Sequence, residues 1–506
     1  MPSFDPSRDV FRAAPIVDKQ VFVAAEKPDI PPSYRLVDAE GFWIAADRNL
    51  PVVPVLAAGG RRIGFLLGNA YSEFHGEFLP EGEAEFPVAI ATIGDLELLF
   101  LPRISGSFVF VSCGGLPKRI YMDHGASFPI VYSPSDRRAA SSVALLLTEA
   151  DYQARFRADL HNTLIGKEGT GSWISGTLTA HRGVHRVIAN HYLDLETWTA
   201  RRFWPRPGEF AQWRDFDEAV DVAAKAVTEF SAAASRAFSL GVTLTAGMDS
   251  RLLVASCRPI VDKVEFFTLE APNTDMDADV SSRIAKRFGL AHRVMPLHAA
   301  SEEAMAVWDR MVGDCTMEVT RRTYTTVADL TERNAILTGL YGETARCRLY
   351  RQDYETINQG VIDVDFIADR LTVPQHPELL DNFREWLAEL EGQPNSVIME
   401  MAFVELKVGI WSMGQRPISN SVKLNFLPFC QRRVLEMFVG VEPAKKGTEA
   451  LFMAVILRLW PELMEFKINK YGDARDRLTI FKKLANPNKV RRYLRDRFAK
   501  KMERAK

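Results

Sequence analysis

Residues 239–256, SLGVTLTAGMDSRLLVAS, pass directly from an apolar strand-like run into an apolar helix-like run. The connection, Thr-Ala-Gly-Met-Asp-Ser, is short and begins with small side chains. A tight turn between a parallel strand and a helix directs backbone N–H groups outward, where the helix dipole favours an anion. Small side chains at 245–247 let a phosphate approach this backbone closely. The stretch therefore predicts an anion site at the carboxyl edge of a parallel sheet.

The flanking sequence predicts the sheet itself. A helix-spaced apolar pattern over 215–240 precedes the first strand, and strands and helices alternate after it. Such alternation indicates parallel strands in a doubly wound α/β sheet. After the strand at 241–245, we expect helices over 250–257 and 275–290, and strands over 263–270, 292–297 and 334–339.

Several side chains of the turn suit a phosphate site. Thr245 and Ser250 can donate hydroxyl hydrogen bonds. Asp249 alone would repel an anion, but a divalent cation between its carboxylate and a phosphate would reverse that effect. The simpler alternative is that Asp249 and Ser250 only start the helix, as Asp and Ser commonly do.

The segment LTAGMDSRLL resembles the pyrophosphate loop, Ser-Gly-Gly-X-Asp-Ser, of the asparagine-synthetase-like ATP pyrophosphatases. The likeness covers about residues 206–475 and includes VEFFTLEAPNTDMDADVSSRIAKRFGLAHRV, AILTGLYGETARCRLY and NFLPFCQRRVLEMFVGV. It implies an α/β doubly wound parallel-sheet ATP pyrophosphatase domain, of the adenine nucleotide alpha hydrolase-like kind, over 206–506, with a helical C-terminal part. It also implies ATP and Mg²⁺ as cofactors.

The same resemblance implies the site residues. Asp249 and Glu343 would hold the metal, and catalysis would use Glu343 with Lys467 or Lys470. The backbone near Phe267 would hold adenine. The residues that would bind the nucleotide are Thr245, Ala246, Gly247, Met248, Asp249, Ser250, Arg251, Phe267, Thr268, Leu269 and Gly339.

The first 205 residues contain short β-type runs separated by Gly, Pro and Asp. We expect a strand in 61–72, a meander over 106–133 and helical structure over 139–166 with strands nearby. The runs ISGSFVFV and RIYMDHGASFPIVYS look like the N-terminal glutaminase domain of the same family. This implies an α+β Ntn-hydrolase-like sandwich over 1–205, joined to the second domain near PRPGEF, residues 205–210.

The glutaminase of this family uses a cysteine at the mature N-terminus, whereas this chain starts Met1-Pro2 and its first cysteine is Cys113. Glutamine hydrolysis is therefore not expected. Lasso-peptide cyclases and β-lactam synthetases share this loss and use the substrate's own amine. The resemblance thus implies a ligase that adenylates a small-molecule or peptide carboxylate, releases pyrophosphate and forms an amide, preferably by ring closure. A precursor peptide or a protease would then be a partner. The alternatives are amidation of a glycan or metabolite acid, or non-catalytic nucleotide or partner binding.

The chain departs from the family pattern at three places. Ala246 stands where the loop has Gly, Gly342 where the second motif has a metal-binding Asp, and Cys430-Gln431 where Leu-Asp is typical. The Cβ at position 246 would cost about 1 kcal/mol or more if its φ were positive. The missing acids leave Glu343 as the second metal ligand, and they favour the non-catalytic alternative.

Other charged residues have structural explanations beside functional ones. Arg251 would either face a phosphate or form a surface ion pair, and Glu343 and Arg346, three residues apart, predict a salt bridge. The start of the helix at 275–290 explains a trio that resembles a metal cluster, namely Asp275, Asp277 and Asp279.

Composition excludes several classes of protein. The formal net charge is −2, and 47% of the residues are hydrophobic, which is an ordinary globular balance. Residues 482–506 hold 11 Lys and Arg but few aromatic residues, so a nucleic-acid partner is not expected. Five cysteines without a CxxC pair, no apolar run that could span a bilayer and no signal-peptide core predict a cytoplasmic protein that binds no membrane.

Overall fold

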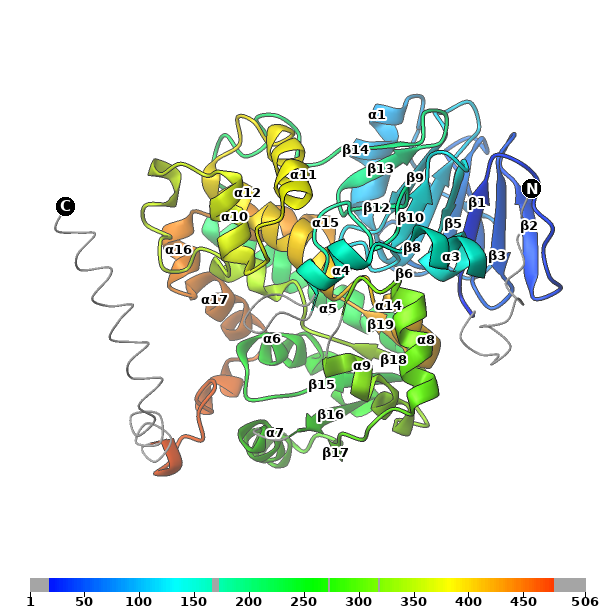
Figure 1. The fold of residues 1–506 in the computed structure, drawn as a ribbon. Helices are drawn as coiled ribbons and strands as arrows, with labels where there is room; N and C mark the ends of the chain where they lie inside the picture. Colours follow the sequence, from blue (N-terminus) through cyan, green and yellow to red (C-terminus); the bar gives the residue numbers. More distant parts are fainter. Residues whose placement is uncertain (1–17, 166–172, 272–273, 317–318, 477–506) are drawn as a thin grey trace.

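The computed structural model describes residues 18–165, 173–271, 274–316 and 319–476, and these residues form three β-sheets (Figure 1). Two sheets belong to the N-terminal part and are antiparallel except where β4 meets β7. The third sheet comes later in the chain, and its five strands are all parallel. An α+β first part followed by a parallel sheet therefore agrees with the expected architecture.

The N-terminal sheets enclose one core layer and are covered by further apolar clusters outside it. Val21 of β1 and Val109 of β8 belong to one cluster, whereas the next residues along the same strands, Phe22 and Phe110, belong to two others. Because alternate strand residues face opposite sides, the shared cluster lies between the sheets. The first sheet has the order β12 (His185–Val187), β10 (Ile130–Ser133), β11 (Arg138–Ala140), β1 (Val21–Ala24), β3 (Trp43–Asp47) and β2 (Tyr34–Asp38). The second has the order β14 (Thr199–Arg202), β13 (His191–Asp194), β9 (Arg119–Met122), β8 (Ile104–Ser112), β5 (Arg62–Ser72), β4 (Val52–Leu56) and β7 (Ala84–Glu85), with β6 (Glu77–Phe78) beside β5.

The expected meander over 106–133 is wrong in its last strand. β9 pairs with β8, but β10 lies in the other sheet. Between them, the Asp123 carboxylate accepts hydrogen bonds from the N–H groups of Ser127 and Phe128 at 3.0 and 2.9 Å. This turn leads the chain from one sheet to the other, and the strand pattern alone does not reveal it.

The helical structure expected over 139–166, with strands nearby, is confirmed in the described residues, where the segment begins in β11 and continues as three short helices. The side chains of Ser142 and Thr148 accept hydrogen bonds from N–H groups three residues later, and each starts a new helix. The helices of the N-terminal part are α1 (Ile93–Asp95), α2 (Val143–Leu146), α3 (Glu149–Arg155) and α4 (Ala158–Leu164).

The parallel sheet confirms the strands predicted after residue 239. Its order is β17 (His292–Pro296), β16 (Val264–Glu270), β15 (Leu240–Thr243), β18 (Ala335–Leu337) and β19 (Leu424–Phe426). The chain builds outward from β15 to β17 and then crosses to the other side of β15. The order therefore reverses between β15 and β18, and at such a switch point the loops after the two strands separate and leave a crevice.

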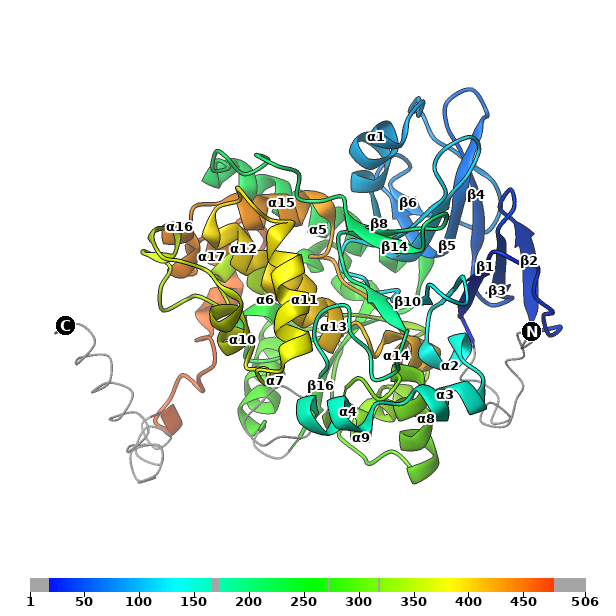
Figure 2. The same ribbon diagram turned by 45° about the horizontal axis from the view of Figure 1, so that its top comes forward.

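Helices surround this sheet and extend away from it as a helical layer (Figure 2). α7 packs on β16 and β17, α6 packs on β15, and α14 contacts β19. The helix predicted over 215–240 is confirmed, and its N-cap Asp215 accepts from Glu218 N. The helices are α5 (Phe216–Ala237), α6 (Met248–Ser256), α7 (Asp275–Phe288), α8 (Glu302–Val312), α9 (Val319–Thr323), α10 (Val364–Leu371), α11 (Pro377–Ala388), α12 (Asn395–Met401), α13 (Gly409–Trp411), α14 (Arg416–Val422), α15 (Arg432–Gly440), α16 (Pro443–Gly447) and α17 (Ala450–Leu459).

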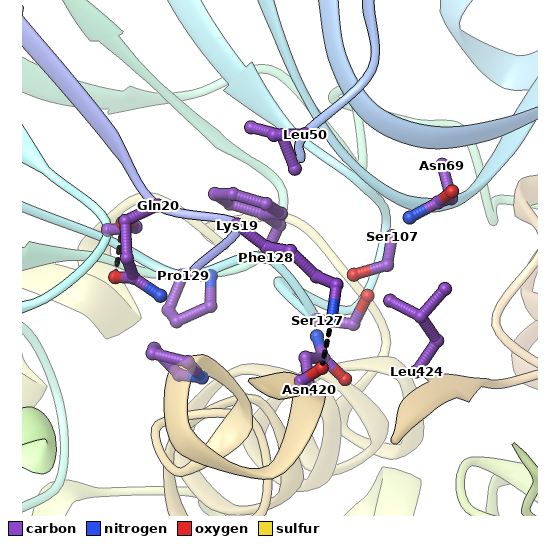
Figure 3. Close-up of a pocket in the computed structure, with 12 residues that line it drawn as sticks. Lys19, Gln20, Leu50, Asn69, Ser107, Ser127, Phe128, Pro129, Asn420 and Leu424 are labelled. Carbon is purple, nitrogen blue, oxygen red and sulfur yellow. Dashed lines mark hydrogen bonds between the residues drawn. The ribbon is translucent and has the colours of Figure 1, made fainter. Parts of the chain in front are cut away.

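The two parts of the chain pack through a common aromatic cluster. The ring centroid of Phe78 on β6 lies 5.4 Å from that of Phe230 on α5 and 4.9 Å from that of Phe426 on β19. Nearby, Lys19 Nζ donates to Asn420 O at 3.2 Å across a cavity of about 20 Å³ (Figure 3). A cavity of that size holds about one water molecule, so the two parts are closely packed here.

Within the described residues, every helix is too short or too polar to cross a lipid bilayer.

Candidate functional site

The turn after β15 is held by its own hydroxyl groups. Ser250 Oγ accepts from Thr245 N at 3.0 Å and lies 2.9 Å from Thr245 Oγ1, which in turn accepts from Gly247 N at 3.1 Å. α6 begins at Met248 with Gly247 as its N-cap. The two hydroxyls expected to bind phosphate thus already bind the turn. The N–H groups at the start of α6 have no intrahelical acceptor, so the anion site predicted here would use them first.

Ala246 fits the turn without backbone strain. It is buried, and it is not one of the described residues with positive φ. Its N–H donates to Asp277 Oδ1 at 2.9 Å. The carboxylate expected to cap α7 therefore reaches back to the turn, while the N-cap of α7, Thr274, makes no side-chain cap. A phosphate that used the Ala246 amide would have to displace Asp277.

The two predicted metal ligands come together at the switch point. Asp249 lies in the first turn of α6, after β15, and Glu343 lies in the 3₁₀ turn Gly342–Arg346, after β18. Arg346 Nη2 donates to Asp249 Oδ2 at 2.6 Å and to Glu343 Oε1 at 3.2 Å. The predicted Glu343–Arg346 salt bridge is confirmed. One guanidinium therefore joins the two carboxylates, which are 94 positions apart in the numbering (343 minus 249).

Two glycines allow this close approach. A Cβ on Gly339 would lie 2.9 Å from Asp249 O, and a Cβ on Gly342 would lie 3.4 Å from Asp249 Oδ1. Gly342 is the position at which the resembling family has an aspartate. In this chain the third carboxylate is absent, and the guanidinium of Arg346 lies between Asp249 and Glu343. The two acids therefore face a cation and not a third acid.

Asp249 is held in an environment that disfavours its charge. Burial raises the pKa of its carboxyl to about 6, against the opposing effect of the Arg346 guanidinium, and Glu343 raises it further. One of its oxygens, Oδ1, is buried and has no hydrogen-bond partner. Such an oxygen is costly unless a proton or a cation satisfies it.

The donor set fits a metal ion only in part. Asp249 and Glu343 offer the oxygen ligands that Mg²⁺ prefers. No group of three or more acidic, histidine or cysteine side chains among the described residues could hold a metal ion. Phosphate oxygens and water would have to complete the coordination, as is common for Mg²⁺ bound with a nucleotide. The trio of Asp275, Asp277 and Asp279 does not form a metal cluster.

Arg251 supports the turn from behind and does not face an open anion site. Its side chain is fully buried, in contrast to both explanations expected from the sequence. The guanidinium donates to the carbonyl groups of Ala246 at 3.3 Å, of Lys467 at 2.9 Å, and of Phe466. It therefore binds residues 463–476, the C-terminal segment, against the predicted nucleotide loop.

The same segment brings the two predicted lysines beside the loop. Asn469 N donates to Ala246 O at 3.0 Å, so the backbone between Lys467 and Lys470 lies against the turn. Both lysine side chains are exposed. Both lysines therefore lie beside the turn, but within the described residues neither ammonium forms a hydrogen bond or ion pair with Asp249 or Glu343, whose cation partner is Arg346. Their role at a nucleotide stays a prediction.

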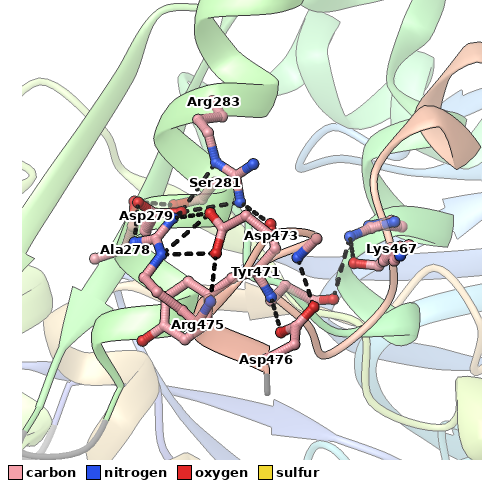
Figure 4. Close-up of polar contacts among 12 residues, drawn as sticks. Ala278, Asp279, Ser281, Arg283, Lys467, Tyr471, Asp473, Arg475 and Asp476 are labelled. Carbon is pink, nitrogen blue, oxygen red and sulfur yellow. Dashed lines mark hydrogen bonds and ion pairs between the residues drawn. The ribbon is translucent and has the colours of Figure 1, made fainter. Parts of the chain in front are cut away.

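The end of this segment is tied to α7 (Figure 4). Arg475 Nη1 donates to Asp279 Oδ1 at 2.9 Å, and Arg283 Nη2 donates to Tyr471 O at 2.6 Å. Arg283 Nε also donates to Asp279 Oδ2 at 2.9 Å, so Asp279 binds two arginines. Because α7 follows β16, this contact keeps the C-terminal segment over the edge of the sheet where the predicted nucleotide loop lies.

The backbone predicted to hold adenine extends past the end of β15. β15 ends at Thr243, opposite Phe267, while β16 continues through Thr268 and Leu269 beside β17. The side chain of Thr268 is buried, and its Oγ1 lies 2.6 Å from Leu244 O. After Phe267, the edge of β16 on the β15 side therefore has no strand partner. A base could pair there with the backbone.

All five cysteines are free thiols, and all five are buried. Burial raises the pKa of Cys113 to about 11, so its thiol is protonated at neutral pH. Met1-Pro2 and the basic stretch at 482–506 lie outside the described residues.

The sequence reasoning missed a buried polar triad behind the site. Lys446 Nζ donates to Glu400 Oε1 at 2.8 Å, and Tyr350 Oη donates to the same oxygen at 2.7 Å. All three side chains are at most 1% exposed. Nothing in their spacing along the chain signals this contact, because it joins three separate elements.

No protein-family model matches the sequence, and no curated protein matches it.

Proposed function

We propose that the chain is an ATP-dependent carbon–nitrogen ligase, built from an Ntn-hydrolase-like N-terminal sandwich and an ATP pyrophosphatase domain. A substrate carboxylate attacks the α-phosphorus of ATP and pyrophosphate leaves. An amine then attacks the acyl carbon, the amide forms and AMP leaves. The amine belongs to the same substrate, so the product is a macrocyclic peptide or a small lactam, and no glutamine is hydrolysed.

The observation that carries this proposal is the meeting of Asp249 with Glu343 at the switch point through Arg346, at 2.6 and 3.2 Å. The place is where parallel α/β sheets bind ligands. Mg²⁺ held by the two carboxylates would neutralise the charge that develops on the leaving pyrophosphate. This role suits an acid whose second oxygen is buried without a partner.

Three further features support the proposal. The C-terminal segment places Lys467 and Lys470 beside the loop, where an ammonium could approach the phosphates of a nucleotide. The backbone edge at Thr268 and Leu269 lies free of β15, where a base could bind. Burial of every cysteine agrees with an amine that comes from the substrate and not from glutamine.

Nucleotide turnover with candidate carboxylates tests the proposal. The protein should convert ATP to AMP and pyrophosphate when it is given Mg²⁺ and peptides or small acids that carry their own amine. Asp249→Asn should abolish this turnover and keep the far-UV circular dichroism of the parent. Asp381→Asn, at an exposed ion pair on α11, is the matched control and should keep full activity. Formation of ADP and phosphate, or normal turnover by Asp249→Asn, would exclude the mechanism.

A second candidate, a nucleotide-binding protein without turnover, is favoured by the occupied amides of the turn. The N–H groups of Thr245, Ala246 and Gly247 all have intramolecular acceptors, and Gly342 supplies no acid. Calorimetry separates the two candidates. Heat on titration with Mg²⁺ and ATP, combined with no product from any carboxylate, would favour the binding protein.

A further inference from the structure

Next to the Asp249–Glu343 pair lies a pocket of about 340 Å³ that is rich in arginine. None of the residues of the turn at 245–250 lines it, so it is separate from the predicted phosphate loop. Its lining combines the turn after β18 with α10 and consists mainly of Glu343, Arg346, Arg348, Arg351, Gln352 and Arg370.

Each of these arginines already has a carboxylate partner that fixes its position. Arg348 Nε donates to Glu343 Oε1 at 2.9 Å, in addition to the bond from Arg346. The carboxylate partners of the other two arginines lie outside the pocket lining. Arg351 Nη1 lies 2.6 Å from Glu449 Oε1, and Arg370 Nη2 lies 2.5 Å from Asp353 Oδ2. With Asp249 bound to Arg346, four carboxylates match four guanidiniums, so the pocket holds its cations in place without a large excess of charge.

Most N–H donors of these arginines nevertheless take no part in the contacts described above. A guanidinium carries five N–H donors, and these contacts occupy one or two on each residue. The Nε groups of Arg346 and Arg370 are buried and have no acceptor. Buried N–H donors without partners are costly, and a planar anion with several oxygens is the ligand that satisfies guanidinium groups best.

We propose that this arginine pocket binds a carboxylate group of an acidic substrate, so that the substrate is a di- or tricarboxylate. The part of this proposal that concerns the reacting group rests on the proposed ligase function, whereas binding of the acid does not. One carboxylate lies in the arginine pocket. A second one of the same molecule reaches past Glu343 toward the phosphate loop, where it becomes the group that is activated.

The position of the pocket favours a carboxylate over pyrophosphate. A nucleotide on the loop would place its phosphates near Asp249, at the start of α6. The arginine pocket contains no part of that loop, and its opening is lined by Arg348 and Arg351, whose side chains are 54% and 53% exposed. Planar guanidinium groups match the planar, bidentate geometry of a carboxylate.

Calorimetry of the full chain at low salt, with tricarballylate as the probe, tests the pocket. Tricarballylate should bind, and its neutral triamide should not. The double variant Arg348→Gln/Arg351→Gln should weaken binding by about tenfold or more, because each lost charged hydrogen bond is worth about that factor. Arg384→Gln, which removes an exposed arginine of α11, is the control and should leave the affinity unchanged. Both changed arginines are half exposed, so the double variant should fold normally, which thermal unfolding checks.

Several outcomes would overturn the pocket assignment. These are equal binding of the triamide, no binding of tricarballylate, or an affinity that does not change in the double variant. If pyrophosphate binds instead of tricarballylate and loses affinity in the double variant, the pocket is a phosphate site and the carboxylate assignment is wrong. Titration of Mg²⁺ and ATP into the same samples keeps the two proposals apart. Binding of tricarballylate without binding of the nucleotide would refute the ligase and leave the acid pocket intact.

Discussion

Asp249→Asn should make the stability of the protein less dependent on pH. Burial raises the pKa of Asp249 from an ordinary value near 3.8 to about 6, so the folded protein binds this proton more tightly than the unfolded chain does. Its contribution to stability is therefore complete below about pH 4 and is lost as the pH rises through 6. A shift of about two units corresponds to at most about 3 kcal/mol, and about 1.5 kcal/mol of that is lost between pH 5 and pH 8.

Asparagine keeps the size of the side chain and an acceptor for Arg346, but it does not titrate. Relative to the parent, Asp249→Asn should therefore gain about 1.5 kcal/mol of unfolding free energy between pH 5 and pH 8. Urea unfolding at four or five pH values in this range measures the difference. Asp381→Asn, at an exposed site, should show no such trend. If the difference between Asp249→Asn and the parent is the same at pH 5 and pH 8, the carboxylate is not held in a desolvated state.

Three other substitutions test how the site is supported. Lys446→Met should lower the free energy of unfolding in urea by about 3–5 kcal/mol, because it leaves a buried carboxylate unpaired, and adding Glu400→Gln should recover part of the loss. Gly125→Ala should cost about 1–3 kcal/mol of unfolding free energy in the same assay, because its Cβ would overlap a buried cysteine sulfur and a tyrosine ring. The control Gly94→Ala, whose Cβ would have its nearest contact at 3.5 Å, should change the stability by less than about 0.5 kcal/mol. Arg251→Met removes four hydrogen bonds to backbone carbonyls and should speed amide hydrogen exchange in the C-terminal segment by at least about tenfold, and unchanged exchange there would contradict its supporting role.

Local sequence patterns predicted four of the five strands of the parallel sheet, and β19 was missed. Each of the first three strands is a short apolar run, and α7 carries its apolar residues at helical spacing, whereas α6 is buried at nearly every position. The pairing of Asp249 with Glu343 was implied by the family resemblance, and it agrees with the rule that the carboxyl ends of parallel strands share one edge. The two acids lie close together because β15 and β18, the strands that precede them, are neighbours in the sheet, and the local sequence pattern does not give this strand order.

Side-chain partners at the site could not be predicted in the same way. Asp277 lies in the first turn of α7, where an acid normally stabilises its own helix, yet it binds the turn at Ala246. Arg251 follows the predicted pyrophosphate loop, where a cation suggests a phosphate, yet it is buried under three carbonyl groups of the C-terminal segment and that of Ala246. The partners of Asp277 and Arg251 depend on the depth at which α6 and α7 pack and on a segment some 200 residues later in the chain. A local sequence pattern contains neither kind of information.

Arg348 and Arg351 are the clearest signal in the sequence that was not used, and Arg346 was predicted only as the salt-bridge partner of Glu343. The spacing places these arginines on a turn directly after a buried strand, at the sheet edge where ligands bind. A cluster of cations beside two carboxylates is informative only when the partners of each arginine are known.

The contact between Tyr341 and Gly125 joins the N-terminal part to the candidate site. Tyr341 and Cys347 bracket the turn that carries Glu343, and both have positive φ, at 70° and 52°, which costs roughly 1–3 kcal/mol for each non-glycine residue. Such a conformation persists only where its surroundings fix it. Tyr341 is fully buried, and its hydroxyl donates to Gly125 O at 2.7 Å in the turn between β9 and β10. The N-terminal sandwich therefore holds the strained turn that presents Glu343 and Arg346 to Asp249.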